Sequence, residues 1–453
     1  MLAALLNQTR GTLTNLLCIS GTQHHDWTAD YRLYSKERLD ESVLFDHVRA
    51  SVLESLSPDQ PLVVALDDTI IRKTGKRIHG AGWKRDPLGP AFQTNLVHAQ
   101  RYLQFSAAWP LPDGEARMVP IDFQHAPTPP KPRKNAPDFD EQQKQYREAL
   151  KQQNLNAVCL DRIKMLRQKV PVDRHVILNG DGSFTNKTIL QNLPEGCTYL
   201  GRGRKDMALH HLPEPQKNED PIGAGRPRRY GKKAHRPEEL RQDESIPWQR
   251  IRAFAAGTHH NFKVKTMGPV LWRKTGTVKP LRIVVIAPLS YRLTKGGKML
   301  YRQPAYLVCN DLELPVEKIL QYYLWRWGIE VNFREEKSLV GTGEAQVRGE
   351  ASNQLLPAVT VAAYAMLWTS ALLQSSGEEI GSSLKPPKWR LPSKSKPKYR
   401  PPPTGKLQRI LRHEIWASSI KLSDYEDFTA PDDSNAKPEK LKMNLAANLF
   451  STA

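Results

Sequence analysis

Cysteine is scarce in this chain, with four residues among 453, and no two of them are spaced as CxxC. Neither a disulfide framework nor a cysteine zinc site is therefore expected, and a reducing, cytoplasmic setting is predicted. Long apolar runs are also lacking: no run of 18 apolar residues occurs, and the segment VTVAAYAMLW is too short to cross a bilayer. We therefore expect no membrane partner.

Acidic residues are too few to balance the basic ones. Lysine and arginine total 67 against 47 aspartate and glutamate, which gives a formal net charge of +20. Such an excess favours binding to polyanions, because lysine and arginine contact phosphates and release counterions. Nucleic acid is the predicted partner, and the alternative is a basic protein that is merely soluble or ribosome-associated.

One group of side chains follows helical spacing in the segment QYYLWRWGIEVNFREEKSLVG. Tyr323, Arg326, Glu330 and Lys337 lie at offsets of 0, 3, 7 and 14 residues. At about 100° per residue, all four fall within one arc of about 60° on a single helix. A carboxylate can hold a divalent metal, and cations beside it can bind phosphate. The alternative is an ordinary amphipathic helix with i,i+4 ion pairs, such as Arg326 with Glu330.

Two apolar segments upstream have the length of a buried strand and end in aspartate. The first, PLVVALDDT, ends in Asp67 and Asp68, and the second, VILNGDG, ends in Asp181. Both are predicted to be buried central strands. Neighbouring residues of a strand point to opposite faces, so only one residue of the Asp67–Asp68 pair is expected to face a metal site.

The spacing Y-x2-R-x3-E-x6-K, with two such strands before it, resembles the YREK-signature group of bacterial insertion-sequence transposases in the DDE superfamily. The likeness extends from about residue 60 to about residue 368. It implies an α/β fold with an RNase H-like mixed sheet flanked by helices. It also implies that Asp67, Asp181 and Glu330 hold two Mg²⁺ or Mn²⁺ ions. The family pattern of aspartate, any residue and threonine selects Asp67 over Asp68.

The resemblance implies further that Tyr323, Arg326 and Lys337 bind DNA phosphates beside the metals. The activity expected from it is cut-and-paste transposition, in which element ends are cleaved and joined to target DNA. Its partners would be double-stranded DNA, namely terminal inverted repeats and target, and a second copy in a homodimeric DNA complex. The expected location is the bacterial cytoplasm, at the nucleoid. Two alternatives remain: a domesticated DNA-binding protein without activity, and an RNase H-like host nuclease.

Composition and patterning divide the chain into five segments. The first is mainly helical and could bind DNA, the second and fourth form the catalytic core, the third is a β-rich insertion, and the last is a basic, proline-rich tail. From Lys385 to Arg412 this tail carries no acid, and we expect it to be disordered alone and to contact DNA. The alternative is a solvated tail. The predicted segments are 1–58, 59–203, 204–304, 305–376 and 377–453.

Overall fold

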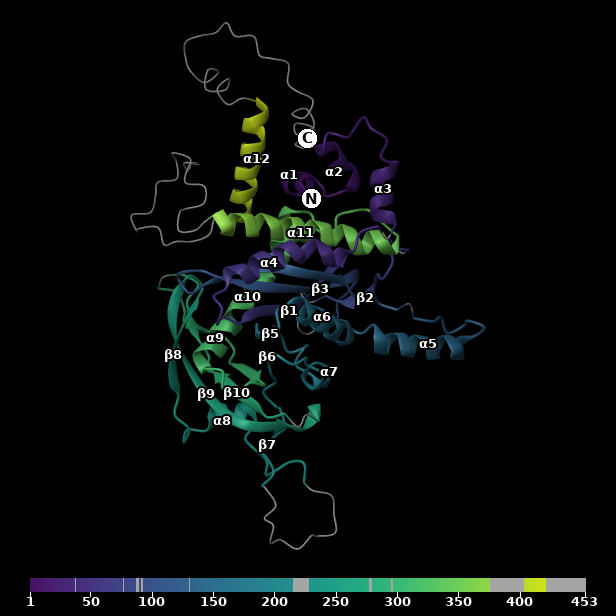
Figure 1. Cartoon of the computed structure of the whole chain (residues 1–453). Helices are drawn as coiled ribbons and strands as arrows, with labels where there is room; N and C mark the ends of the chain where they lie inside the picture. Colours follow the sequence, from purple (N-terminus) through teal and green to yellow (C-terminus); the bar gives the residue numbers. More distant parts are fainter. Residues whose placement is uncertain are drawn as a thin grey trace, which may run out of the picture.

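The computed structural model describes residues 1–374 and 403–420. Within the first range it leaves out Glu37, Lys76, Pro130, Lys295 and the segments 87–88, 91–92, 215–227 and 277–278. Figure 1 shows one large sheet with a group of helices gathered at one end of it and further helices alongside it. The mixed α/β class expected from the sequence is confirmed.

The sheet has 11 strands, and its longest path runs β2-β3-β1-β5-β6-β13-β10-β9-β7, with β4 paired to β3 and β8 paired to β9. β1 pairs antiparallel with β3 and parallel with β5, and β5 pairs parallel with β6. This mixture of directions is the one expected for an RNase H-like core. The strands are β1 Leu62–Arg72, β2 Gly82–Arg85, β3 Leu96–Pro110, β4 Ala116–His125, β5 Val176–Gly180, β6 Cys197–Arg202, β7 Leu209–His210, β8 Gln249–Ala255, β9 Thr258–Trp272, β10 Leu281–Ile286 and β13 Ala305–Cys309.

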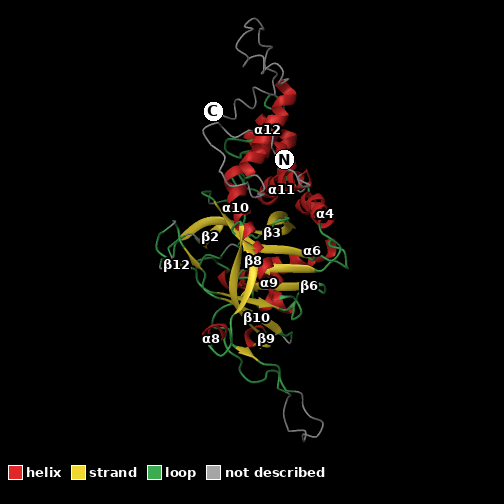
Figure 2. Ribbon diagram, turned by 90° about the vertical axis from the view of Figure 1, so that its left-hand side faces the viewer, coloured by secondary structure: helices red, strands yellow, loops and turns green. Residues whose placement is uncertain are grey.

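Helices cover both faces of this sheet, and a separate group of them stacks beyond one end (Figure 2). A small two-stranded sheet, β11 Ser290–Tyr291 with β12 Leu300–Tyr301, lies outside the main one. The helices are α1 Leu2–Leu6, α2 Leu13–Ile19, α3 Thr28–Ser35, α4 Asp46–Ser55, α5 Phe139–Gln152, α6 Leu155–Lys169, α7 Lys187–Gln191, α8 Pro237–Gln242, α9 Val316–Trp325, α10 Trp327–Leu339, α11 Glu350–Gln374 and α12 Thr404–Ile420, with short 3-10 turns η1 Glu41–Phe45 and η2 Arg273–Thr275.

Several elements follow the sequence pattern closely. The N-terminal region is helical and both aspartate strands form. The helical segment after residue 138 is interrupted between α5 and α6. Asn154 begins α6, because its side chain accepts hydrogen bonds from the amides of Asn156 and Ala157. β3 is a single strand of 15 residues, and β4 pairs antiparallel with it.

The strands expected within 204–304 form, and they extend the core sheet. β13 pairs with both β6 and β10, and β10 pairs with β9. The sheet is therefore continuous from the aspartate strands to these later strands. How the chain divides into separate domains stays a prediction.

α11 is the one helix in the described part of the chain that is long and apolar enough to cross a membrane. It has 25 residues with a mean hydropathy of 1.6, but 89% of its apolar window is buried inside the protein. Pro357 lies inside the helix, and its neighbours Leu355 and Leu356 are 4% and 2% exposed. α11 packs on β4 and contacts α3 and α4, as a core helix does.

The disorder expected of the tail is wrong for its last described part, residues 403–412. These residues begin α12, where Thr404, Leu407 and Gln408 are buried. The Arg412 guanidinium donates hydrogen bonds to the carbonyls of Leu6 and Asn7, 3.1 and 3.0 Å away. Long-range packing onto the N-terminal helices therefore orders this part, which its prolines and charges did not indicate. Residues 385–402, which carry the rest of the prediction, lie outside the described residues.

The buried position of Leu407 gives a direct test of this docking. Leu407→Ala should lower the free energy of unfolding by about 2 to 4 kcal/mol, because it removes a buried side chain and leaves a cavity. Leu373→Ala is the matched control: Leu373 is 52% exposed, so its loss should cost under about 0.5 kcal/mol. Chemical denaturation measures both, and equal small effects would contradict the docking of α12.

Candidate active site

The two aspartate strands lie side by side. β5 ends at Gly180, but β1 does not end at its aspartates as expected and continues to Arg72. Leu66 of β1 is opposite Gly180, so Asp67 within β1 is level with Asp181, which directly follows β5. Adjacent strands are about 4.8 Å apart, which brings the two backbones together at one edge of the sheet. Gly180 is required at this point, since an added Cβ would lie 2.6 Å from the Tyr199 hydroxyl.

Alternation along the strands decides which face each carboxylate occupies. In β1, Val63 and Ala65 pack with α9 and α10, and Ile177 of β5 belongs to the same cluster. Asp67 and Asp181 follow these residues at even spacing, so both continue the face that α9 and α10 cover. Leu62, Val64 and Leu66 pack on the opposite face, and Asp68 continues that one.

Arg326 joins the first aspartate to the glutamate of the predicted stripe. Its Nη1 lies 3.2 Å from Asp67 Oδ2, and its Nη2 lies 3.0 Å from Glu330 Oε1. The Arg326 and Asp67 side chains are 13% and 17% exposed, and Glu330 is 37% exposed. The i,i+4 ion pair considered from the sequence therefore exists, and it is part of a three-residue cluster with Asp67.

The four predicted residues do not lie on one continuous helix, so that expectation is wrong. α9 ends at Trp325 and α10 begins at Trp327, with Arg326 between them. The Arg326 backbone keeps right-handed helical angles, φ −50° and ψ −34°, so the chain direction continues across the break. The Arg326 guanidinium lies 5.9 Å from the centre of the Tyr323 ring, which preserves the contact between these two residues.

Lys337 lies farther along α10 and binds the end of β1. Its Nζ donates hydrogen bonds to Thr69 Oγ1 at 2.6 Å and to the Ile70 carbonyl at 3.0 Å. Burial lowers the pKa of this amine, while the Glu336 carboxylate opposes that shift. Lys337 thus fixes α10 against the strand that carries Asp67.

Burial also shifts the pKa of the Asp67 carboxyl. It raises the pKa of Asp67 to about 7, and the nearby Asp181 carboxylate adds to the rise, while Arg326 opposes it. An ionised Asp67 therefore needs a neighbouring cation, because a buried carboxylate without one is unfavourable. Arg326 supplies such a charge in this structure.

Sequence reasoning missed the partners of Asp68. Arg101 Nε lies 3.1 Å from Asp68 Oδ2, and the Lys84 amine is near enough to interact with both groups. Burial lowers the pKa of Lys84 to about 8, with Arg101 lowering it further and Asp68 opposing. Partial burial raises the pKa of Asp68, Arg101 opposes this shift and the Asp181 carboxylate adds to it, so Asp68 also needs a cation. Only strand register identifies Arg101 as that cation.

An ion-binding role fits the chemistry of these residues. Asp67, Asp181 and Glu330 offer only oxygen ligands, which suit Mg²⁺ and Mn²⁺. Asp67 and Asp181 continue the face of the sheet that α9 and α10 cover, Glu330 lies on α10, and Asp67 needs a compensating cation. Among the described residues, however, no three acidic, histidine or cysteine side chains are grouped closely enough to hold an ion as they stand. The Arg326 guanidinium is what neutralises Asp67 and Glu330 here.

The sheet order and the carboxylates at its edge define an RNase H-like protein of the DDE type. The chain matches the family model of the DDE superfamily endonucleases over residues 1–275, more than half of its length, and it belongs to that family. Asp67 and Asp181 lie within the match, and Glu330 lies beyond it. The family implies a DNA substrate, a nuclease or transposase activity and the use of divalent metal ions. No curated protein matches the chain.

The raised pKa of Asp67 predicts how the metal-free protein responds to pH. A carboxyl whose folded pKa is raised from 3.8 to about 7 stabilises the fold below about pH 4. This contribution is lost as pH rises through 7, at up to about 1.4 kcal/mol per pH unit. The free energy of unfolding of Asp67→Asn, measured relative to that of the wild type, should therefore increase from pH 4 to pH 8 by at most about 4 kcal/mol.

Urea denaturation in the presence of a chelator, at both pH values, checks this expectation. A stability difference between the two proteins that is the same at pH 4 and pH 8 would contradict the raised pKa.

Proposed function

We propose that this chain is a cut-and-paste DNA transposase of the YREK group, which cleaves the ends of its element and joins them to target DNA. The observation that carries the proposal is the shared face: Asp67 and Asp181 continue the side of the sheet covered by α9 and α10, and Glu330 lies on α10. The remaining expectations are part of this proposal: terminal inverted repeats as substrate, a homodimeric DNA complex and a nucleoid location.

In this proposal Asp67, Asp181 and Glu330 would hold two divalent ions. Such ions would activate an attacking oxygen and stabilise the leaving one. Hydrolysis breaks the phosphodiester bond at the element end, with water as nucleophile, and frees a 3′-hydroxyl. That hydroxyl next attacks a target phosphate and displaces a second 3′-oxygen. Both steps exchange one P–O bond for another, so no covalent bond to the protein is needed.

The proposed phosphate ligands are Tyr323, Arg326 and Lys337. Arg326 is the strongest of the three, because a guanidinium can bind two phosphate oxygens at once. In this structure it is bonded to Asp67 and Glu330. Divalent ions on those carboxylates would neutralise them and leave the guanidinium to a phosphate. Lys337 contributes positive charge while it holds the end of β1.

Asp67 and Asp68 lie on opposite faces of the sheet, so variants at these two positions form a matched pair. Asp67→Asn, Asp181→Asn and Glu330→Gln should each reduce cleavage by about 1,000-fold or more, which corresponds to ~4 kcal/mol of lost metal-dependent stabilisation. Asp68→Asn should keep cleavage within about 10-fold, because Asp68 pairs with Arg101 on the other face. Cleavage of a labelled duplex carrying the element end, in Mg²⁺ or Mn²⁺, measures all four.

The products of the same reaction separate the alternatives. A joined product shows transposition, cleavage without joining shows a host-type nuclease, and duplex binding without either shows a DNA-binding protein that has lost activity. Cleavage that survives Asp67→Asn but not Asp68→Asn would overturn the assignment of the first carboxylate.

Arg326 is expected to act on DNA and not as a metal ligand. Arg326→Gln should bind Mn²⁺ at least as tightly as the wild type, because the cation that competes for Asp67 and Glu330 is gone. Joining of pre-cut ends should fall by about 10- to 100-fold, the effect of about 1.5 to 3 kcal/mol for a charged hydrogen bond. Arg334→Gln is the control, since Arg334 is exposed on the same helix.

Manganese titration and a joining assay check these two effects separately. Weaker Mn²⁺ binding together with normal joining would contradict the role given to Arg326.

A further inference from the structure

A second basic element projects from the body of the protein, apart from the carboxylates. We define the arm as Pro129 with residues 131–152: an extended segment leads outward, and α5 returns toward α6 (Figure 1). α5 buries none of its 14 residues. A helix that packs so little is expected to meet a partner or solvent along most of its length.

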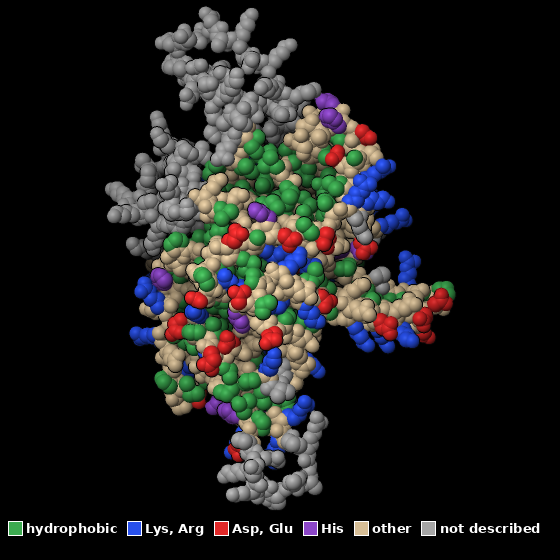
Figure 3. Space-filling model, viewed as in Figure 1, with side chains coloured by type: hydrophobic (Ala, Val, Ile, Leu, Met, Phe, Trp, Pro, Cys, Tyr) green, Lys and Arg blue, Asp and Glu red, His purple; other side chains and the backbone are tan. Residues whose placement is uncertain are grey.

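The charges of the arm are unevenly placed. Three acids, Asp138, Asp140 and Glu141, lie where the extended segment meets α5, and Glu148 is the only other one. In Figure 3 acidic side chains lie toward the tip of the projecting arm, and basic ones lie along its edges. None of the cations forms an ion pair with a residue that the structure describes. The six cations are Lys131, Arg133, Lys134, Lys144, Arg147 and Lys151.

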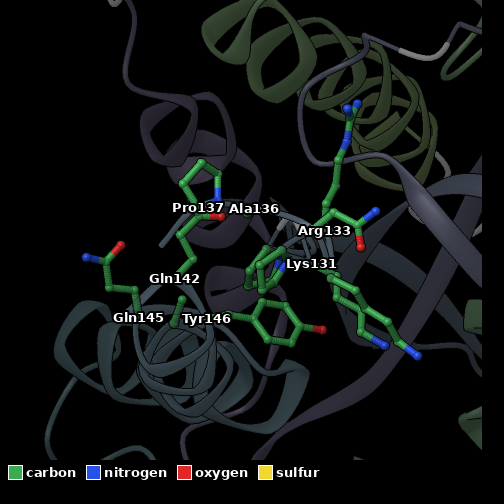
Figure 4. Close-up of a pocket in the computed structure, with 12 residues that line it drawn as sticks. Lys131, Arg133, Ala136, Pro137, Gln142, Gln145 and Tyr146 are labelled. Atoms are coloured by element: carbon green, nitrogen blue, oxygen red, sulfur yellow. The ribbon is translucent and has the colours of Figure 1, made fainter. Parts of the chain in front are cut away.

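The two sides of the arm enclose an open hollow. Residues of the extended segment, including Lys131 and Arg133, line one side of it, and Gln142, Gln145 and Tyr146 of α5 line the other. Figure 4 shows Tyr146 reaching from α5 toward the extended segment, while the Arg133 side chain extends away from the hollow. The arm therefore presents cations outward as well as toward its own helix.

The two ends of the arm that join it to the body of the protein, here called its roots, are connected to the part of the sheet that carries the aspartates. The first root follows β4, whose last residue His125 pairs with Tyr102, and Tyr102 pairs with Thr69, two residues past Asp67. At the second root, the Asn186 side chain donates a hydrogen bond to Asn156 Oδ1, 2.9 Å away. Asn186 belongs to the turn that follows Asp181. The first root is thus connected to β1 through β3, and the second is connected through α6 to the turn after Asp181.

We propose that the arm binds the phosphate backbone of duplex DNA on one side of the cleavage position. This inference rests on the proposed function, because it takes the carboxylate edge as the place of cleavage. α5 is about 21 Å long, at 1.5 Å per residue. Duplex DNA rises about 3.4 Å per base pair, so the arm spans about six base pairs. Its contacts are to phosphates, and they hold the flanking duplex without reading its sequence.

The test neutralises the three cations of the extended segment together, as K131Q/R133Q/K134Q. All three are exposed, so the variant should fold like the wild type, which thermal unfolding verifies. Binding to a duplex with long flanks is then measured against salt concentration. The plot of log affinity against log salt should become flatter, and the magnitude of its slope should decrease by about 2 to 3, at about 0.9 for each lost phosphate contact. The charge-conserving variant K131R/R133K/K134R should keep the wild-type slope.

A second test varies the length of the duplex. Cleavage of a short duplex that ends close to the cut should be equal for the neutral variant and the wild type, whereas cleavage of subsaturating long duplex should fall by about 10-fold or more. An unchanged salt slope overturns the proposal. If the slope is unchanged and the neutral variant sediments with a lower molecular mass than the wild type, the proposal also fails. That result would show that the arm contacts a second copy of the chain.

The outcome for the arm is distinguishable from the outcome for the proposed function. If wild-type protein cuts no DNA but the slope falls as expected, the nuclease proposal fails and the arm remains a duplex-binding element. If wild-type protein cuts and joins DNA while the neutral variant matches it at every flank length, only the arm proposal fails.

Discussion

The parallel pairing of β1 with β5 determines where negative charge is concentrated in this protein. It brings Asp67 within β1 next to Asp181, which directly follows β5, and the Asp181 carboxylate adds to the rise in the pKa of Asp67. The site can hold this charge only with a cation close by. Arg326 meets that need in the structure by bonding to both Asp67 and Glu330. Divalent metal ions would meet the same need in the reaction.

The rest of the molecule is arranged around this edge. α9 and α10 cover the face that both aspartates continue, and Lys337 fastens α10 to the end of β1. The arm is connected to this region through β4 and through the hydrogen bond between Asn186 and Asn156. If the proposals for the carboxylates and the arm both hold, DNA bound along the arm would continue toward the carboxylates.

Local pattern was enough to predict that the two aspartate strands and helical structure around Glu330 form, because burial and alternation depend on neighbours in sequence. It failed where distant segments decide the outcome. The Arg101 partner of Asp68 is set by the register of β1 with β3. The order of α12 depends on Arg412 reaching carbonyls of the N-terminal segment, about 400 residues away. The break at Arg326 is likewise not visible in the spacing of the four stripe residues.

The central claim is that Asp67, Asp181 and Glu330 together bind the catalytic ions. A crystal of the protein soaked in Mn²⁺ and measured for anomalous scattering tests it most directly. We predict anomalous peaks beside Asp67 of β1 and the end of β5, with carboxylate oxygens of these three residues at about 2.0 to 2.2 Å. Arg326 should be turned from Asp67, and Asp68 should still be paired with Arg101. Peaks ligated by Asp68, or the absence of any peak at this edge while the Arg326 ion pairs persist, would contradict it.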